Sequence, residues 1–276
     1  MNLFEPGHSG NCDVMIYNTD SYVALMRARA DGSLPDMGSA LRLVDILRRH
    51  VVTARAHDGH VELLDVGCAA GHFFRTFIRN GIPLTKYWGV EIDPAMIAVA
   101  LKVWKNEILE GNAGFVNADI MDFTPGQKFD FVICMNAFMY FPSPKAALER
   151  MIAATRKRLL IRSYFTDSNY RIIRAQTKSN HNKSEIEEIQ AFDDEGNIRK
   201  FDLWNIYSFE YIEALVKTIC PQARLEWLDD NNMVEAIAAE ERLNIHKRGA
   251  TQIISGYEVS YPFILPWKYL SLELDN

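Results

Sequence analysis

The segment from Leu63 to Phe73 constrains the fold more than any other part of the chain, and it is read as Leu-Leu-Asp-Val-Gly-Cys-Ala-Ala-Gly-His-Phe. An apolar run ends in an acid, turns through small residues and continues into a helical pattern. Gly67 and Gly71 suit a tight turn, because glycine adopts backbone conformations that a side chain disfavours. Such a strand-to-helix turn lets a ligand touch backbone N–H groups directly. The segment therefore predicts a nucleotide-binding type of α/β fold.

Apolar runs and helical patterns alternate along the chain around this turn. Strands are predicted at residues 61–66, 87–92, 114–118, 129–135, 158–164 and 223–228. Helices are predicted at residues 21–30, 39–52, 73–78, 94–104, 144–155, 208–220 and 233–243. This alternation is typical of a mainly parallel sheet with helices on both faces. We therefore predict a doubly wound α/β fold.

A single domain is expected from the length of 276 residues. Residues 1–55 predict an N-terminal helical arm, and residues 60–165 predict the core of the sheet. Residues 166–207 are polar and predict an insertion that covers the substrate side as a lid, in which segments 189–192 and 198–204 form a β-hairpin. Residues 208–276 complete the sheet, and the β-prone tail 256–274 predicts a final strand near its edge.

The turn does not fit a nicotinamide-dinucleotide site, because Ala69 and His72 break the pattern G-x-G-x-x-G. It instead resembles the first motif of class I S-adenosylmethionine-dependent methyltransferases, an acid and an apolar residue followed by G-x-G-x-G. Ala69 is the one departure. Later segments are similar to the same family, in the same order and spacing, over roughly residues 60–165. The resemblance implies methyl transfer, with S-adenosylmethionine as cofactor and S-adenosylhomocysteine as product.

Three further strand ends carry residues that the resemblance assigns to the cofactor. Glu91 is implied to accept both ribose hydroxyls, whereas Asp93 is better explained as a helix N-cap. Asp119 and Ile120 are implied to face the adenine, although Asp119 taken alone also fits a turn-forming residue. Asn136 ends the fourth strand, where open α/β sheets bind ligands. The full implied set is Asp65, Gly67, Ala69, Gly71, Glu91, Ile92, Asp119, Ile120 and Asn136.

The methyl acceptor leaves a weaker imprint, because methyl transfer from a sulfonium mainly requires in-line positioning. No catalytic acid or base is assigned. Tyr140, Arg162 and His181 are the candidates for substrate contact. Core packing explains Tyr140 at least as well, and a solvated loop residue is the favoured interpretation of His181. His72 either reaches the crevice or lies on the helix surface. The fourth strand lacks the prolines of DNA amino-methyltransferases and the acids of metal-dependent catechol enzymes, so we expect neither DNA nor a metal.

Residues 141–183 are strongly basic, which makes an anionic small molecule one hypothesis for the acceptor. The alternative is a solvated basic face balanced by the acidic stretch 185–194. A net charge of -6 and a pI of about 5.7 argue against a dedicated nucleic-acid binder. A protein or RNA methyltransferase, or a non-catalytic nucleotide-binding protein of the same fold, stays an alternative.

Four cysteines, none in a CxxC pair, do not suggest a zinc site. No apolar run approaches the roughly 20 residues that cross a bilayer, and no signal peptide is evident at Met1–Asp13. We therefore expect a cytoplasmic protein without a membrane partner. The sequence does not predict its oligomeric state.

Overall fold

The central sheet has the strand order β3-β2-β1-β4-β5-β12-β8, and β6 and β7 join it beside β5. The computed structural model describes residues 20–175, 197, 201–230, 251–254, 257–260, 263–264 and 267–274. The strands of this sheet are β1 Glu62–Val66, β2 Lys86–Glu91, β3 Ala113–Asn117, β4 Phe129–Met135, β5 Thr155–Thr166, β6 Tyr170–Ala175, β7 Phe201–Ser208, β8 Arg224–Asp229 and β12 Trp267–Glu273. Neighbouring strands from β3 to β5 run parallel, as predicted.

The last strand lies inside the sheet. β12 pairs antiparallel with β5 on one side and with β8 on the other. The tail therefore adds a final strand near the edge of the sheet, as predicted, although β8 takes the edge position itself. The physical reason is the burial of Tyr269, Leu270 and Leu272, none of which is exposed. A strand that is apolar on both faces needs cover on both faces. A separate small antiparallel sheet contains β9 Thr251–Ile254, β10 Tyr257–Ser260 and β11 Phe263–Ile264.

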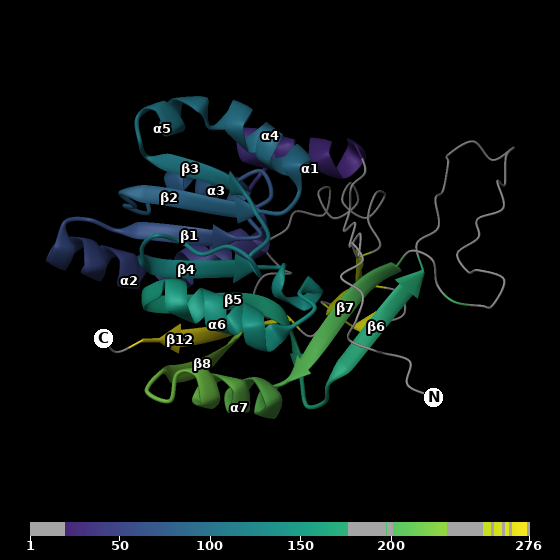
Figure 1. Cartoon of the computed structure of the whole chain (residues 1–276). Coiled ribbons are helices and arrows are strands. Elements are labelled where there is room, and N and C mark those ends of the chain that lie inside the picture. The colour runs from purple at the N-terminus through teal and green to yellow at the C-terminus, as the bar shows by residue number, and fades with distance from the viewer. Residues whose placement is uncertain are drawn as a thin grey trace, which may run out of the picture.

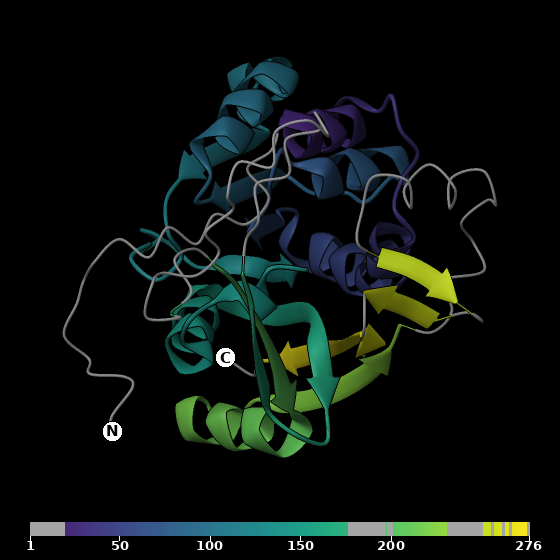
Figure 2. The ribbon, with the colours of Figure 1, turned by 90° about the vertical axis from the view of Figure 1, so that its right-hand side faces the viewer.

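Two layers of helices cover the sheet (Figures 1 and 2). The helices are α1 Asp20–Asp31, α2 Gly38–Asp58, α3 His72–Arg79, α4 Pro94–Val103, α5 Lys105–Leu109, η1 Phe138–Tyr140, α6 Pro144–Ala154 and α7 Phe209–Ile219. Phe131 and Ile133 of β4 belong to the core under α1 to α4, whereas Val132 and Cys134 belong to the core under α6 and α7. This period of two confirms that β4 is buried on both faces.

Short polar residues begin three of the helices. The side chains of Asp93, Ser143 and Ser208 accept hydrogen bonds from backbone N–H groups in the first turns of α4, α6 and α7. Each cap satisfies a donor that the helix itself leaves unpaired. The predicted N-cap role of Asp93 is confirmed, and Ser208 is the N-cap at the start of the helix predicted at residues 208–220. Helix α2 continues past its predicted end and stops at Gly59, which is left-handed with φ 65°.

The predicted insertion contains an antiparallel ribbon of β6 and β7, and β7 also pairs parallel with the end of β5. Figure 1 shows this ribbon on the side where the arrows of β1, β2 and β4 end. The second arm of the predicted hairpin overlaps β7, but β6 was not predicted, because its residues mix basic and apolar side chains. The first arm, 189–192, and the helix predicted at 233–243 lie outside the described residues.

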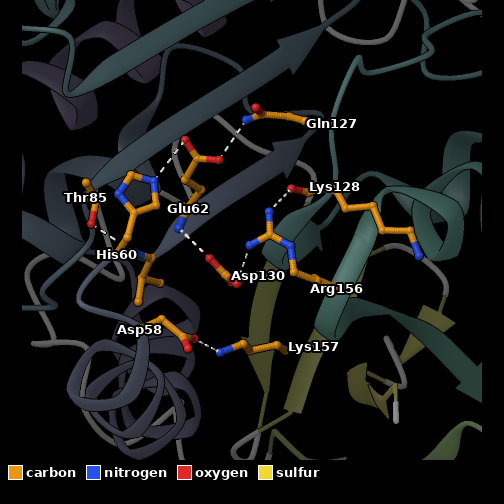
Figure 3. Close-up of polar contacts among 10 residues, drawn as sticks. Asp58, His60, Glu62, Thr85, Gln127, Lys128, Asp130, Arg156 and Lys157 are labelled. Carbon is orange, nitrogen blue, oxygen red and sulfur yellow. Dashed lines mark hydrogen bonds and ion pairs between the residues drawn. The ribbon is translucent and has the colours of Figure 1, made fainter. Parts of the chain in front are cut away.

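Polar side chains join the amino-terminal ends of β1, β4 and β5 (Figure 3). Asp130, only 1% exposed, accepts hydrogen bonds from the backbone N–H of Glu62 at 3.0 Å and from Arg156 at 2.7 Å. Glu62 in turn accepts from Gln127 at 2.7 Å. This network is structural, and it lies at the edge opposite the carboxyl ends of the strands, where open α/β sheets bind ligands.

Candidate active site

A strained turn links β1 to α3 at the carboxyl edge of the sheet. Gly67, Ala69 and Gly71 have φ values of 76°, 47° and 79°. A Cβ on Gly71 would lie 2.7 Å from Nε1 of Trp104, and one on Gly67 would lie 2.5 Å from Cβ of Ala137. Both positions therefore need glycine for space as well as for conformation. Ala69 adopts the left-handed conformation despite its side chain, and such strain is concentrated at functional sites.

Asp65 ends β1 and is completely buried. Its Oδ2 accepts a hydrogen bond from the hydroxyl of Tyr87, whereas its Oδ1 has no partner within the described part of the chain. Burial raises the pKa of Asp65 to about 7, although the Tyr87 hydrogen bond acts in the opposite direction. A buried carboxylate oxygen without a donor is unfavourable. Asp65 is therefore suited to receive a cationic N–H donor from a ligand.

The carboxylate of Glu91 connects the end of β2 to the strained turn. It accepts the backbone N–H of Ala69 at 2.9 Å and that of Asp93 at 3.0 Å. Burial raises the pKa of Glu91, and these two hydrogen bonds oppose the shift. Each carboxylate oxygen keeps the capacity to accept one more hydrogen bond. The neighbouring Ile92 is 60% exposed, so this strand end offers a carboxylate beside an apolar side chain.

Asp119 organises the turn after β3. Its Oδ1 accepts the backbone N–H of Met121 at 2.9 Å, and its carbonyl accepts the N–H of Phe123 at 2.8 Å. Asp119 thus has the turn-forming role that its residue type alone suggests, with a half-buried carboxylate. Ile120 is 5% exposed and packs into the core under α6 and α7.

Asn136, directly after β4, is joined to Arg162, which lies within β5 beside the end of β4. Asn136 is left-handed with φ 61°, and its backbone N–H donates to the carbonyl of Arg162 at 3.0 Å. The Arg162 guanidinium donates to Oδ1 of Asn136 and to Asp230, the latter through Nε at 2.8 Å and through Nη2. It also lies 3.8 Å from the ring centre of Trp267. Arg162, one of the candidates for substrate contact, is 4% exposed and is engaged by these internal partners.

Tyr140 and His181 were the other substrate candidates. Tyr140 ends the short helix η1, is half-buried, and packs with the apolar cluster that contains Tyr164 and Trp267. Trp267, which contacts Arg162, packs against the same cluster. His181 lies outside the described residues.

His72 is the first residue of α3 and follows the strained turn directly. It is 8% exposed, so the surface position considered from the sequence was wrong. Both ring nitrogens lack a hydrogen-bond partner in the described structure. Burial is the largest cause that lowers the pKa of His72 to about 3, with the nearby charge of Arg29 next. The imidazole is therefore neutral at physiological pH.

Sequence reasoning missed Tyr87, Asp230 and Trp267. Tyr87 looked like an ordinary strand residue, and its hydrogen bond to Asp65 joins the neighbouring strands β2 and β1. Asp230 stands in an Asp-Asp-Asn-Asn run that is typical of a loop. Its pairing with Arg162 joins residues that are 68 positions apart. No local pattern marks such contacts.

The described residues contain no group of three or more His, Cys, Asp or Glu side chains that could hold a metal ion. No helix among them combines the length and apolar character needed to span a membrane. Cys68, Cys134 and Cys220 are free and buried.

A family model described as a methyltransferase domain matches residues 57–200. A search of curated proteins found no match. Among solved structures, the amino pentose methyltransferase CalS10 from Micromonospora echinaspora matches with 17% identity and a TM-score of 0.50, covering 93% of this chain and 98% of that one. Phosphoethanolamine N-methyltransferase 2 from Haemonchus contortus matches with 16% identity and a TM-score of 0.50, over 79% of this chain and 49% of that one. The 4+2 cyclase SpnF matches with 17% identity and a TM-score of 0.50, over 84% of this chain and 80% of that one.

Proposed function

Because the chain belongs to the methyltransferase domain family, we propose that it transfers the methyl group of S-adenosylmethionine to a small-molecule acceptor. The strongest support for the proposal is the position of the Glu91 carboxylate. The Glu91 carboxylate is held against the strained turn by the N–H groups of Ala69 and Asp93, at the carboxyl edge of a parallel sheet. This is the geometry of a ribose site beside a backbone cradle.

The cofactor fits the groups at this edge. The unpartnered Oδ1 of Asp65 suits the cofactor's ammonium group, which supplies the missing donor. The turn at Gly67, Ala69 and Gly71 lets the methionine part approach the backbone. Glu91 accepts the ribose hydroxyls, and the exposed Ile92 covers an apolar face of the nucleoside.

Two further groups complete the proposed cofactor set. Asp119 is held in place by the hydrogen bond from Met121 in the turn after β3. Its carboxylate accepts from the adenine amine, with Ile120 beside it. Asn136 is next in the chain to Ala137, whose Cβ lies close to Gly67 of the strained turn. Asn136 therefore lies beside the proposed cofactor.

When bound, the sulfonium supplies a methyl group attached to an activated leaving group. The protein's own task is to hold the acceptor in line with that methyl group and to exclude water. The residues at the ends of β4 and β5 are placed for this task, because they stand next to the turn that would carry the cofactor.

A small-molecule acceptor is favoured over the alternatives. CalS10 and the phosphoethanolamine enzyme are named for small acceptors, although at 17% and 16% identity they share only the fold with this chain. SpnF has the same fold and is named a cyclase, so the fold alone does not establish methyl transfer. An anionic acceptor bound by Arg162 is less supported than a neutral one, because the guanidinium is already engaged by Asp230 and Asn136.

The proposal includes a cytoplasmic location, because the free cysteines suit a reducing compartment.

The test is the binding of S-adenosylmethionine and S-adenosylhomocysteine, measured by calorimetry. Glu91→Ala removes the ribose acceptor and should weaken both affinities about tenfold or more, roughly 1.4 kcal/mol. Asp93→Ala is the matched control, because the side chain of this acid caps α4, and its backbone N–H, which donates to Glu91, is kept in the variant. The control should lose stability, about 1 kcal/mol, and keep its affinity. Absence of binding by the wild type would refute the proposed function.

A further inference from the structure

We propose that Asn136 presents its NH2 group, rather than its carbonyl oxygen, to the site of methyl transfer, and that Arg162 and Asp230 are the positioning residues that hold it there. The acceptor atom would then be an oxygen. The inference rests on the proposed function, which it refines by naming the chemical class of the acceptor.

The orientation of the Asn136 amide follows from its partner. A guanidinium has only donors, so the amide atom that faces Arg162 must be the oxygen. The contact is indeed from Nη1 of Arg162 to Oδ1 of Asn136. No hydrogen bond in the described part of the structure uses Nδ2 of Asn136, and the residue is half-buried. The NH2 group is therefore the part of this side chain that remains for a ligand.

Arg162 cannot easily release this amide, because the guanidinium is fixed on three sides. Its Nε and Nη2 both donate to Oδ2 of Asp230, and its Cζ lies 3.8 Å from the ring centre of Trp267. Arg162 and Asp230 are 4% and 6% exposed. A paired and enclosed arginine of this kind loses little freedom on making one more hydrogen bond. The chain of contacts from Asp230 through Arg162 to Asn136 thus fixes which end of the amide points outward.

Asn136 stands next to the proposed cofactor turn. Its φ of 61° turns the chain sharply at the end of β4, and the next residue, Ala137, is the one that a Cβ on Gly67 would meet at 2.5 Å. The backbone N–H of Asn136 is also tied to Arg162, at 3.0 Å. Strain held by surrounding contacts is expected where a side chain must be aimed.

A donor at this position selects the acceptor atom. A neutral amine has one lone pair, which it uses to attack the methyl carbon, and it has none left for Asn136. A hydroxyl or carboxylate oxygen attacks with one lone pair and accepts from the Asn136 NH2 with another. The new O–CH3 bond forms as the C–S bond breaks, and its electron pair passes to sulfur. A carboxylate has no proton to lose, and a hydroxyl proton passes to solvent.

The probe is the pair S-adenosylhomocysteine and sinefungin, the analogue in which a carbon replaces the sulfur and a protonated amine replaces the transferable methyl group. Calorimetry gives the ratio of their dissociation constants, in which all shared contacts cancel. In the wild type the amine meets the Asn136 donors, so sinefungin should bind no more tightly than S-adenosylhomocysteine. Asn136→Asp replaces the NH2 group with an acceptor and keeps the contact to Arg162. It should shift the ratio toward sinefungin about tenfold or more.

Arg162→Lys keeps the positive charge but replaces the guanidinium, whose Nη1 faces the amide while Nε and Nη2 hold Asp230, with a single ammonium. An ammonium paired with Asp230 no longer holds the amide from a second nitrogen, so the amide is free to turn its oxygen outward. The ratio should again shift toward sinefungin. Arg158→Lys is the matched control, because Arg158 is also buried in β5 but bonds to Ser271 and Glu273, farther from the carboxyl edge. Its ratio should stay at the wild-type value.

Two results would overturn the inference while leaving the proposed function intact. A wild type that already prefers sinefungin tenfold would show that the carbonyl oxygen faces the methyl site. An unchanged ratio in Asn136→Asp would show that this side chain does not face the methyl site. If none of the cofactor compounds binds, it is the proposed function that fails.

Discussion

At the scale of single residues, the site is built from polar groups that are buried and incompletely paired. Among the described residues, no donor reaches one oxygen of Asp65 and no partner reaches either ring nitrogen of His72. The pKa of Asp65 is raised to about 7, and that of His72 is lowered to about 3. Burial is the largest cause of both shifts, and it leaves both groups neutral in mildly acidic solution. Such groups are unfavourable in the free protein. Both groups lie beside the strained turn, so a ligand bound there would supply the missing hydrogen-bond partners and remove this cost.

Cofactor binding should be coupled to the ionisation of Asp65. At pH 6 the carboxyl group of the free protein is mostly protonated, because its pKa is about 7. A bound ammonium group favours the carboxylate, so binding lowers that pKa and releases a proton. Affinity for S-adenosylhomocysteine should therefore rise as the pH increases from 6 to 8, and then level off.

This coupling is measured by calorimetry at pH 6 in two buffers that differ in ionisation enthalpy, which reports the protons released. Asp65→Asn cannot ionise, so it should remove both the proton release and this part of the pH dependence. Proton release that persists in Asp65→Asn would assign it to another group.

At the scale of elements, two left-handed glycines end or begin helices, but they differ in the space around them. Gly71 has a left-handed backbone and no room for a Cβ. Gly59, which ends α2, has a similar φ of 65° but nothing within 4 Å of the added Cβ. The pair therefore separates conformational strain from steric overlap.

We expect Gly59→Ala to lower the free energy of unfolding by about 1 kcal/mol, the cost of a left-handed alanine. Gly71→Ala should cost about 1–3 kcal/mol more, because the methyl group overlaps Trp104 and Phe115. Urea unfolding gives both values, and calorimetry should show weaker S-adenosylhomocysteine binding only for Gly71→Ala. Equal losses of stability would mean that the packing around Gly71 relaxes.

At the scale of the whole molecule, the two edges of the sheet have separate tasks. The amino edge holds β1, β4 and β5 together through Asp130 and its partners (Figure 3). The carboxyl edge holds the strained turn, Glu91 and Asn136. Changes at one edge should add to changes at the other rather than couple with them.

Asp130→Asn should therefore destabilise the protein without changing the site. The variant weakens the contacts to Glu62 and Arg156, which should lower the free energy of unfolding by about 1–3 kcal/mol. Denaturant unfolding measures this loss, and the dissociation constant for S-adenosylhomocysteine should stay within about twofold of the wild type. A larger change in affinity would show that the two edges are coupled.

The sequence by itself determined the elements, because each depends on local chemistry. The apolar runs predicted β1 to β5 and β8, the caps Asp93 and Ser208 begin their helices, and the glycine spacing located the turn. The resemblance carried by Asp65, Glu91 and Asn136 indicated the methyltransferase family, which the domain match shows. All of these signals lie within short stretches of chain.

Only the tertiary structure decided how distant residues meet. It placed β12 between β5 and β8, paired β7 with β6, and buried His72. It also joined Arg162, one of the candidates for substrate contact, to both Asn136 and Asp230. These outcomes depend on strand order and on contacts between residues far apart in the chain. Neither side-chain periodicity nor residue type encodes them locally, because the same residues would suit several sheet positions until the whole core is packed.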